Sequence, residues 1–243
     1  MTTYGNLCSQ FYDATEGYAS EKEVDFYAAF IEKNPGRVLE AMSGSGRLQI
    51  PLLKRGYVVD GVDASSHMLA RCRERCAALN LTPPELYEQS LENLNLPHQY
   101  ATVTIAVGSF QLIHERDQAV KAFKNIRAHM SAKGNLLVDT FVPKVGADPV
   151  SVRAARLDSR TTIRLTTRQI LDEHSHHADA VCTYELIVDG AVQQVEQELV
   201  RVVWYTDQEL EQLFNEAGFN IVHIYEEKFY DAGLSRIVHA QPA

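Results

Sequence analysis

The sequence lacks a long apolar run. No stretch approaches the roughly 20 consecutive apolar residues that a membrane-spanning helix needs. The first residues, MTTYGNLCSQFYD, contain no basic region followed by an apolar core, which is the mark of a secretory signal. We therefore expect no membrane-spanning segment, no signal peptide and no membrane partner.

Cysteine is scarce and scattered. The four cysteines are Cys8, Cys72, Cys76 and Cys182. Cys72 and Cys76 lie one helical turn apart, a spacing that fits neither a CxxC redox pair nor a zinc ribbon. The pattern predicts reduced thiols in a cytoplasmic protein.

Basic residues are also fewer than acidic residues. The chain has 23 Lys and Arg against 32 Asp and Glu, and its formal net charge is -9. Because nucleic-acid binding needs clustered positive charge, we expect no nucleic-acid partner. A chain of 243 residues can hold one large α/β domain with an embellishment, or two small domains. We find no internal repeat and no low-complexity segment.

The most informative stretch is residues 37–69, RVLEAMSGSGRLQIPLLKRGYVVDGVDASSHML. A short apolar strand is followed by the turn Ser43-Gly44-Ser45-Gly46, where small side chains let the backbone approach a ligand. Leucines at helical spacing then predict a helix, whose free N–H groups face whatever lies above the turn. A second apolar run ends at Asp63, and a carboxylate at the end of a parallel strand is placed to bind a ribose diol. The stretch predicts a nucleoside site.

Later segments continue the alternation of strands and helices. Short strands are expected near Leu86-Tyr87, over 101–107 (ATVTIAV) and over 135–141, and helices over 66–79 and 117–130. The run 101–107 is apolar throughout, as in a strand buried on both faces. Five strands alternating with helices predict a parallel, doubly wound sheet with right-handed crossovers.

The pattern changes between about residues 160 and 205, where β-branched residues alternate. Asp189-Gly190 between two such runs predicts a hairpin, and we expect three or four antiparallel strands lying over the strand ends of the main sheet. Residues 143–158 are expected to be a linker or flap. After this, Thr206 is predicted to cap a helix over 207–217, and two runs, 219–225 and 237–240, predict a closing hairpin that returns to the main sheet.

Residues 1–33 contain many aromatic and acidic side chains, spread over two predicted helices with a break at Thr15-Glu16-Gly17-Tyr18. Two interpretations stay open for this segment. It packs against the domain, or it lies across the strand ends as a lid whose tyrosines touch a ligand.

With the glycine turn, Asp63 and the closing hairpin in place, the chain resembles the class I S-adenosylmethionine-dependent methyltransferases. The family's acidic residue and Gly-x-Gly-x-Gly pattern overlay on Glu40, Met42, Gly44 and Gly46. GVDASSHML is similar to its second motif, and residues 106–141 are similar to its fourth strand, helix and fifth strand. The β-rich insertion is similar to that of small-molecule N-methyltransferases, including those that act on amino sugars.

The resemblance implies a fold, a division into domains and a cofactor. The fold is an α/β, Rossmann-like, doubly wound seven-stranded sheet whose last strand is antiparallel, with an antiparallel β layer inserted over the strand ends. Residues 1–142 and 206–243 form the methyltransferase domain with an N-terminal helical lid, and residues 143–205 form the inserted layer that covers the substrate. The cofactor is S-adenosylmethionine, and the partner is a small-molecule methyl acceptor that accepts on nitrogen or oxygen. A homodimer through the edge of the inserted layer stays open.

Each implied cofactor-binding residue has a structural alternative. Asp63 holds the ribose or caps a helix, and Glu40 reaches the cofactor's amino group or is a surface acid. Arg47 pairs with the cofactor carboxylate or is solvated. The full set is Tyr12, Tyr18, Glu40, Met42, Gly44, Gly46, Arg47, Asp63, Ala64, Met68, Ser90, Leu91, Val107 and Gly108.

Two residues depart from the family's pattern. Met42 replaces the first glycine of the turn, where a side chain either points sideways or narrows the cofactor pocket. Ser90 stands where the family often has an aspartate near the adenine, and its hydroxyl still offers one hydrogen bond. These departures leave open a cofactor-binding module that has lost catalysis.

His114 is the catalytic candidate, because it follows the fourth strand and imidazole can take a proton near neutral pH. Its alternative is a loop histidine that shapes the acceptor site. His174-Ser175-His176-His177 invites a metal interpretation, but without further clustered ligands we expect a solvated hairpin end and no metal.

The runner-up function is an NAD-linked oxidoreductase, which also binds a nucleoside on this type of fold. It requires a third glycine three residues after Gly46, where this chain has Gln49. It also requires a wholly parallel sheet, which the predicted closing hairpin contradicts.

Overall fold

The computed structural model describes residues 4–82, 84–143, 149–172, 174, 176–230 and 233–243. Its core is a seven-stranded sheet with the order β10-β11-β5-β4-β1-β2-β3. The first five strands in the chain are parallel to one another, whereas β11 runs antiparallel to both β5 and β10. The strands are β1 (Val38–Ala41), β2 (Val59–Asp63), β3 (Leu86–Glu88), β4 (Tyr100–Ile105), β5 (Met130–Thr140), β10 (Phe219–Tyr230) and β11 (Gly233–Pro242).

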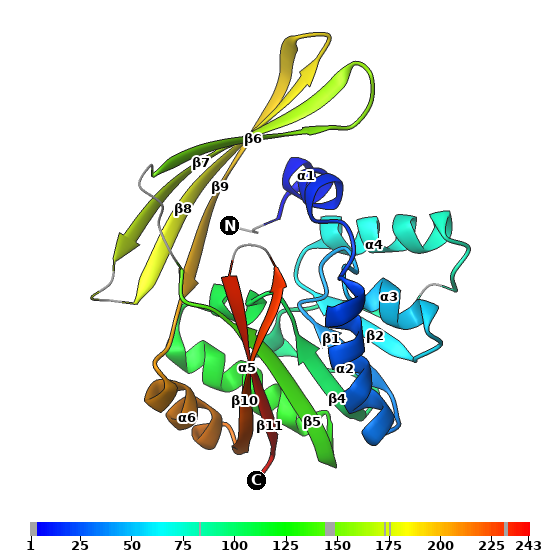
Figure 1. Ribbon diagram of the computed structural model, residues 1–243, viewed down its shortest axis with the longest axis vertical. Coiled ribbons are helices and arrows are strands. Elements are labelled where there is room, and N and C mark those ends of the chain that lie inside the picture. The colour runs from blue at the N-terminus through cyan, green and yellow to red at the C-terminus, as the bar shows by residue number, and fades with distance from the viewer. Residues whose placement is uncertain (1–3, 83, 144–148, 173, 175, 231–232) are drawn as a thin grey trace.

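Helices cover both faces of this sheet (Figure 1). Phe123 of α5 and Phe214 of α6 are fully buried in the cluster that includes β4 and β5. Tyr27 of α2 and Leu52 of α3 are buried in a second cluster, with Val38 of β1. The helices of the main domain are α2 (Glu21–Lys33), α3 (Gln49–Lys54), α4 (Ser66–Ala78), α5 (Arg116–Ala128) and α6 (Asp207–Glu216), with two short 3₁₀ helices, η1 (Leu91–Asn93) and η2 (Ser109–Leu112). The predicted doubly wound fold with an antiparallel last strand is therefore confirmed.

A separate antiparallel sheet has the order β6-β7-β8-β9. Its strands are β6 (Val150–Arg156), β7 (Thr161–Asp172), β8 (His177–Val188) and β9 (Ala191–Val203). The predicted Asp189-Gly190 hairpin joins β8 to β9, with both residues at positive φ (50° and 80°). The interpretation of 143–158 as a linker or flap was wrong for β6, because this segment finds hydrogen-bonding partners in β7; residues 144–148 lie outside the described residues.

Helix α1 (Asn6–Glu16) lies between this second sheet and the main domain (Figure 1). Leu7 and Phe11 of α1 are buried against Ile163, Leu165 and other apolar residues of the second sheet. Because α1 also contacts α4, it joins the two sheets through packed side chains. None of the helices in the described part of the chain is long and apolar enough to cross a membrane.

Local capping signals agree with the structure. Thr206 caps α6, with its side chain accepting from the Glu209 N–H while the Glu209 carboxylate accepts from the Thr206 N–H. The closing hairpin is longer than predicted, because pairing continues beyond the apolar residues to Tyr230 and from Gly233.

Candidate cofactor and acceptor site

A cavity of about 270 Å³ lies at the carboxyl ends of the parallel strands. This is the position where open α/β sheets bind ligands. The walls come from the ends of β1, β2 and β4, the loop after β3, and the segment around α1. The lining residues are Tyr4, Tyr12, Glu40, Met42, Ser43, Gly44, Arg47, Leu48, Asp63, Ala64, Ser65, Met68, Gln89, Ser90, Leu91, Glu92, Ala106, Val107, Ser109, Leu112 and Ile113.

Asp63 and the glycine turn are joined by hydrogen bonds. The Gly44 N–H donates to Asp63 Oδ2 at 2.9 Å, and the Ser65 N–H donates to Asp63 Oδ1 at 2.8 Å. Burial raises the pKa of Asp63, while the backbone donors of Ser65, Gly44 and Ala64 oppose that shift. Each carboxylate oxygen has further lone-pair capacity. The side chain is therefore held in place at the cavity and can still accept from hydroxyl groups.

Glu40 is the buried acid at the end of β1. Glu40 is only 4% exposed, and its Oε2 has no hydrogen-bond partner among the described residues. Burial, reinforced by Glu23, raises the pKa of Glu40 to about 8 although the Arg47 guanidinium acts in the opposite direction. A buried carboxyl that lines a cavity with a free oxygen is suited to pair with a cationic ligand group, such as an ammonium.

Two non-glycine residues in the cavity wall have left-handed backbones. Met42 has φ 58° and Val107 has φ 59°. Such a conformation is uncommon outside glycine, and for a β-branched residue it is an outlier that needs support from its surroundings. The Met42 side chain packs against the main core cluster, and the residue also lines the cavity. Non-glycine residues with a left-handed backbone are found preferentially at ligand-binding and active sites.

Arg47 lines the cavity, but its guanidinium is already paired. Its two terminal nitrogens donate to the carboxylate oxygens of Glu23 at 2.9 and 2.7 Å. The Glu23 side chain is fully buried and that of Arg47 is 10% exposed. This bidentate ion pair joins α2 to the glycine turn, and the pairing of Arg47 with a cofactor carboxylate stays a prediction.

The segment around α1 brings two tyrosines into the cavity wall, Tyr4 and Tyr12. Their rings meet edge to face with centroids 6.5 Å apart. Burial raises the pKa of Tyr12 to about 12, and it also raises the pKa of Tyr4. Both hydroxyls are therefore neutral near pH 7, and each can donate and accept a hydrogen bond.

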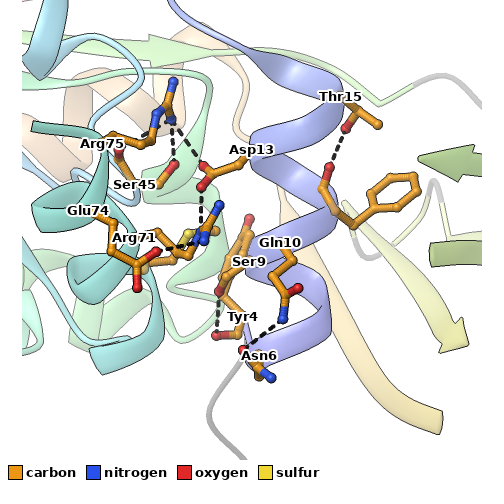
Figure 2. A network of polar contacts seen from close by, with 12 residues as sticks. Tyr4, Asn6, Ser9, Gln10, Asp13, Thr15, Ser45, Arg71, Glu74 and Arg75 are labelled. Carbon is orange, nitrogen blue, oxygen red and sulfur yellow. Dashed lines mark hydrogen bonds and ion pairs between the residues drawn. The ribbon is translucent and has the colours of Figure 1, made fainter. Parts of the chain in front are cut away.

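Ion pairs hold α1 above the site (Figure 2). Asp13 accepts from Arg71 at 2.7 Å and from Arg75 at 3.1 Å, both on α4. Arg75 also donates to Ser45 Oγ at 2.9 Å, within the glycine turn. Tyr18 lies over the Arg75 guanidinium, 4.1 Å from it, and is 43% exposed. The structure thus places Tyr18 outside the cavity lining.

Two predicted glycines also lie outside the lining, and packing requires each of them. A Cβ on Gly46, which has φ 81°, would lie 2.8 Å from Cys72 Sγ. A Cβ on Gly108, which has φ 63°, would lie 2.4 Å from the Phe141 ring. Besides Asp63 and Arg47, nine of the predicted cofactor-binding residues line the cavity, and their binding roles remain predictions: Tyr12, Glu40, Met42, Gly44, Ala64, Met68, Ser90, Leu91 and Val107.

His114 is exposed and does not line the cavity, although its neighbours Leu112 and Ile113 do. The structure therefore does not bring the predicted catalytic base to the site. Sequence reasoning missed Tyr4, Gln89, Glu92, Ser109, Leu112 and Ile113. Most of these flank residues that were singled out, so widening each motif by two positions would have found them.

The histidine run has structural partners. His176 stacks on Trp204 with centroids 5.6 Å apart, and its Nδ1 is 3.5 Å from Glu209. Elsewhere in the described residues, Asp60, Glu85 and His98 place ligand atoms within 4.8 Å of one another. However, Arg37 pairs with both Asp60 and Glu85, so this group already has its countercharge.

Comparison with known proteins agrees with this geometry. The sequence family described as "Methyltransferase domain" matches residues 38–134. A Geobacillus sp. (strain WCH70) protein named as a candidate methyltransferase is 24% identical over 213 residues, which cover 88% of this chain and 84% of that protein. The chain matches the methyltransferase domain family over residues 38–134 and is similar in fold to S-adenosylmethionine-dependent methyltransferases.

Two further relatives of the methyltransferase are informative. Phosphatidylethanolamine N-methyltransferase of Cereibacter sphaeroides is 31% identical over 116 residues, or 47% of this chain, and the chain spans 57% of that protein. The structure of CalS10 with S-adenosylmethionine bound, an amino pentose methyltransferase from Micromonospora echinaspora, has a TM-score of 0.72 at 16% identity. That comparison covers 100% of this chain and 99% of CalS10, so it extends to the inserted sheet.

The residues present fit S-adenosylmethionine, the cofactor of this family. Asp63 offers acceptors for a ribose, Glu40 has an unpartnered buried oxygen for a cationic amino group, and Gly44 leaves the turn without a side chain. The NAD alternative fails on the antiparallel β11 and on the family match. The protein is an enzyme, and the interpretation as a module without catalysis is set aside.

Proposed function

We propose that this methyltransferase transfers a methyl group to an amine nitrogen of a small molecule. S-adenosylmethionine, when bound, supplies a methyl group on a positively charged sulfur, which a nucleophile attacks directly and in line. Among the described residues that line the cavity, the ionisable side chains are Tyr4, Tyr12, Glu40, Arg47, Asp63 and Glu92. None of these is a histidine, lysine or cysteine.

This set of side chains favours nitrogen over oxygen as the acceptor atom. An alcohol needs a positioned base to remove its proton, whereas an amine can lose its proton to water before it binds. The neutral hydroxyls of Tyr4 and Tyr12 can accept an N–H hydrogen bond and so orient the nitrogen lone pair. Proximity and orientation are then the main contributions of the protein.

The proposed roles of the residues follow from their positions. Asp63 binds the ribose hydroxyls, and Glu40 pairs with the amino group of the cofactor. Ser90 and Leu91 lie beside the adenine, while Val107 presents main chain to the methionine part. His114 is exposed and does not line the cavity, and we assign it no proton transfer.

The enclosure of the site supports a small acceptor. Helix α1 covers the cavity and is itself covered by the four-stranded sheet (Figure 1). A closed pocket of this kind suits a small molecule better than a groove for a protein or nucleic acid. The amino pentose acceptor named for CalS10 and the amine acceptor named for the Cereibacter enzyme support nitrogen chemistry.

The test compares matched acceptors. Release of S-adenosylhomocysteine is measured with an amino sugar nucleotide and with the same compound carrying a hydroxyl in place of the amine. We expect turnover only with the amine, at a rate that rises with pH as the ammonium loses its proton. Turnover with the hydroxyl compound alone would contradict the proposal.

We also propose a cytoplasmic location and a homodimer. All four cysteines are free and buried, which supports a reducing compartment. Strands β6 and β9 are the outer strands of the second sheet, and a strand edge can pair with a second copy. Light scattering of the purified chain tests the dimer.

A further inference from the structure

The second sheet is joined to the main domain at two places in the chain. The chain leaves the main sheet after β5, at Phe141, and returns after β9, at Val203. These two crossings lie next to each other, because one side chain, Gln111, bonds to both of them.

Gln111 uses its whole carboxamide at this junction. Its Nε2 donates to the Phe141 carbonyl at 2.9 Å and to the Val203 carbonyl at 2.7 Å. Its Oε1 accepts from the Phe141 N–H at 2.8 Å. The residue is 1% exposed, so water does not replace these bonds. An amide is the side chain that matches two acceptors and one donor at such a position.

The same residue belongs to the wall of the reaction site. Gln111 lies in η2, whose Ser109 and Leu112 line the cavity, and Ile113 follows directly. These residues come after β4, which is separated from β2 and its Asp63 by β1 in the sheet order. The carboxamide therefore connects the acceptor end of the cavity to both ends of the sheet that covers it.

We propose that Gln111 is a positioning residue for methyl transfer, which fixes the inserted sheet relative to the acceptor end of the cavity. The proposal rests on the proposed function, in which the acceptor lies under the inserted sheet. The hydrogen bonds of the Gln111 carboxamide go to Phe141 and Val203, neither of which lines the cavity, so the side chain sets the geometry of the acceptor without setting cofactor affinity. A displacement of a few tenths of an ångström to one ångström is enough to slow an aligned transfer.

The decisive variant is Gln111→Glu, which keeps the size of the side chain. An ionised Glu accepts from the Phe141 N–H but places its second oxygen against two carbonyls, which repel it. A protonated Glu can donate to one of them. Relative to the original chain at the same pH, we expect kcat to fall by about tenfold or more at pH 8 and this ratio to recover in part at pH 6. The dissociation constant for S-adenosylhomocysteine, measured by calorimetry, should stay within about twofold of the original value.

Gln99→Glu is the matched control, because Gln99 is an exposed glutamine that also donates to a backbone carbonyl, that of Ala128 at 3.0 Å. It should change neither kcat nor its pH profile. A purely structural role for Gln111 predicts that cofactor affinity, kcat and melting temperature fall together with no recovery at pH 6, and this result would overturn the proposal.

Hydrogen exchange keeps the test independent of the acceptor. In Gln111→Glu at pH 8, amides of η2 and of β9 near Val203 should exchange faster, while those of β1 and β2 should not change. Unchanged exchange at η2 and β9 would overturn the proposal. If the chain with Gln111 itself turns over no amine, the proposed function fails, and the exchange result still decides the role of Gln111.

Discussion

Asp63 illustrates how a single residue links the turn to the ligand. Its carboxylate accepts from Gly44 and Ser65 before any ligand binds, so its orientation is fixed in advance. Pre-organised acceptors of this kind lose little entropy on binding.

The first prediction concerns this carboxylate. Asp63→Ala removes the acceptor for two backbone N–H groups and for the ribose, and we expect cofactor binding to weaken by about 2 kcal/mol, roughly 30-fold. Calorimetry with S-adenosylhomocysteine measures it. Glu88→Ala is the control, since Glu88 is the exposed acid paired with Asp63 in the sheet register. Equal affinities for the original chain and Asp63→Ala would disprove the assignment.

The second prediction concerns pH and Glu40. Because the folded-state pKa of Glu40 is raised to about 8, its carboxyl is protonated below that pH. The neutral carboxyl of Glu40 stabilises the folded state. This stabilisation is complete below the pKa that Glu40 has in the unfolded chain, and it is lost as the pH rises toward 8. A cationic amino group needs the carboxylate, so cofactor affinity should increase with pH up to about 8 and binding at pH 7 should release a proton. Calorimetry in two buffers of different ionisation enthalpy detects this release, which Glu40→Gln should abolish.

The third prediction concerns Met42. Replacement by glycine relieves the left-handed conformation, worth about 1 kcal/mol. It also removes apolar contacts with the core, worth about 1 kcal/mol. We expect the stability of Met42→Gly to be nearly unchanged in denaturant titrations, while Met42→Ala, which keeps the strain and loses the contacts, is less stable by about 1 kcal/mol. Equal stability of the glycine and alanine variants would show that the strain contributes nothing.

At the scale of elements, helix α1 depends on hydrogen bonds from another part of the chain. Its N-cap, Gly5, has no side chain, so the helix cannot cap itself. Strand β9 supplies the acceptors: Glu198 accepts from the Gly5 N–H, and Glu196 accepts from the Leu7 N–H at 2.8 Å. Negative charge at a helix N-terminus is favourable, and here it comes from the inserted sheet.

The fourth prediction follows from this capping across the structure. Glu196→Ala should destabilise α1 by about 1 kcal/mol, because the Leu7 N–H loses its acceptor. Hydrogen exchange of residues 6–16 should accelerate, and the KM for the acceptor should rise because Tyr12 lies on this helix. Gln197→Ala is the control, since Gln197 is exposed on the same strand. Equal exchange in the two variants would refute a capping role.

At the scale of the whole molecule, several contacts link the inserted sheet to the main domain, and three of them matter most for the site. They are the α1 cluster, the carboxylates of β9 and the carboxamide of Gln111. Helix α1, near the start of the sequence, meets the inserted sheet, which comes from residues 150–203. Large motion of the sheet therefore requires several contacts to open together.

The fifth prediction tests this arrangement. Charge-reversing Asp13→Lys places a cation beside Arg71 and Arg75 and should separate α1 from α4. We expect cofactor affinity to fall by about tenfold, because Tyr4 and Tyr12 leave the cavity wall. Gln10→Lys adds the same charge to the same helix without facing those arginines, since Gln10 bonds to Asn6, and it is the matched control. Similar loss of affinity in both variants would argue against the ion pairs.

The sequence by itself determined what depends on local signals. The strand, glycine turn and Asp63 follow from residues within one βαβ unit, and the Asp189-Gly190 hairpin and the Thr206 cap follow from a few adjacent residues. The tertiary structure alone decided that Glu23 neutralises Arg47, that Tyr4 reaches the cavity, that β6 is a strand and that His114 does not line the cavity. These outcomes depend on packing between segments far apart in the chain, where the partner of a side chain is set by which surfaces meet and not by its own neighbours in sequence.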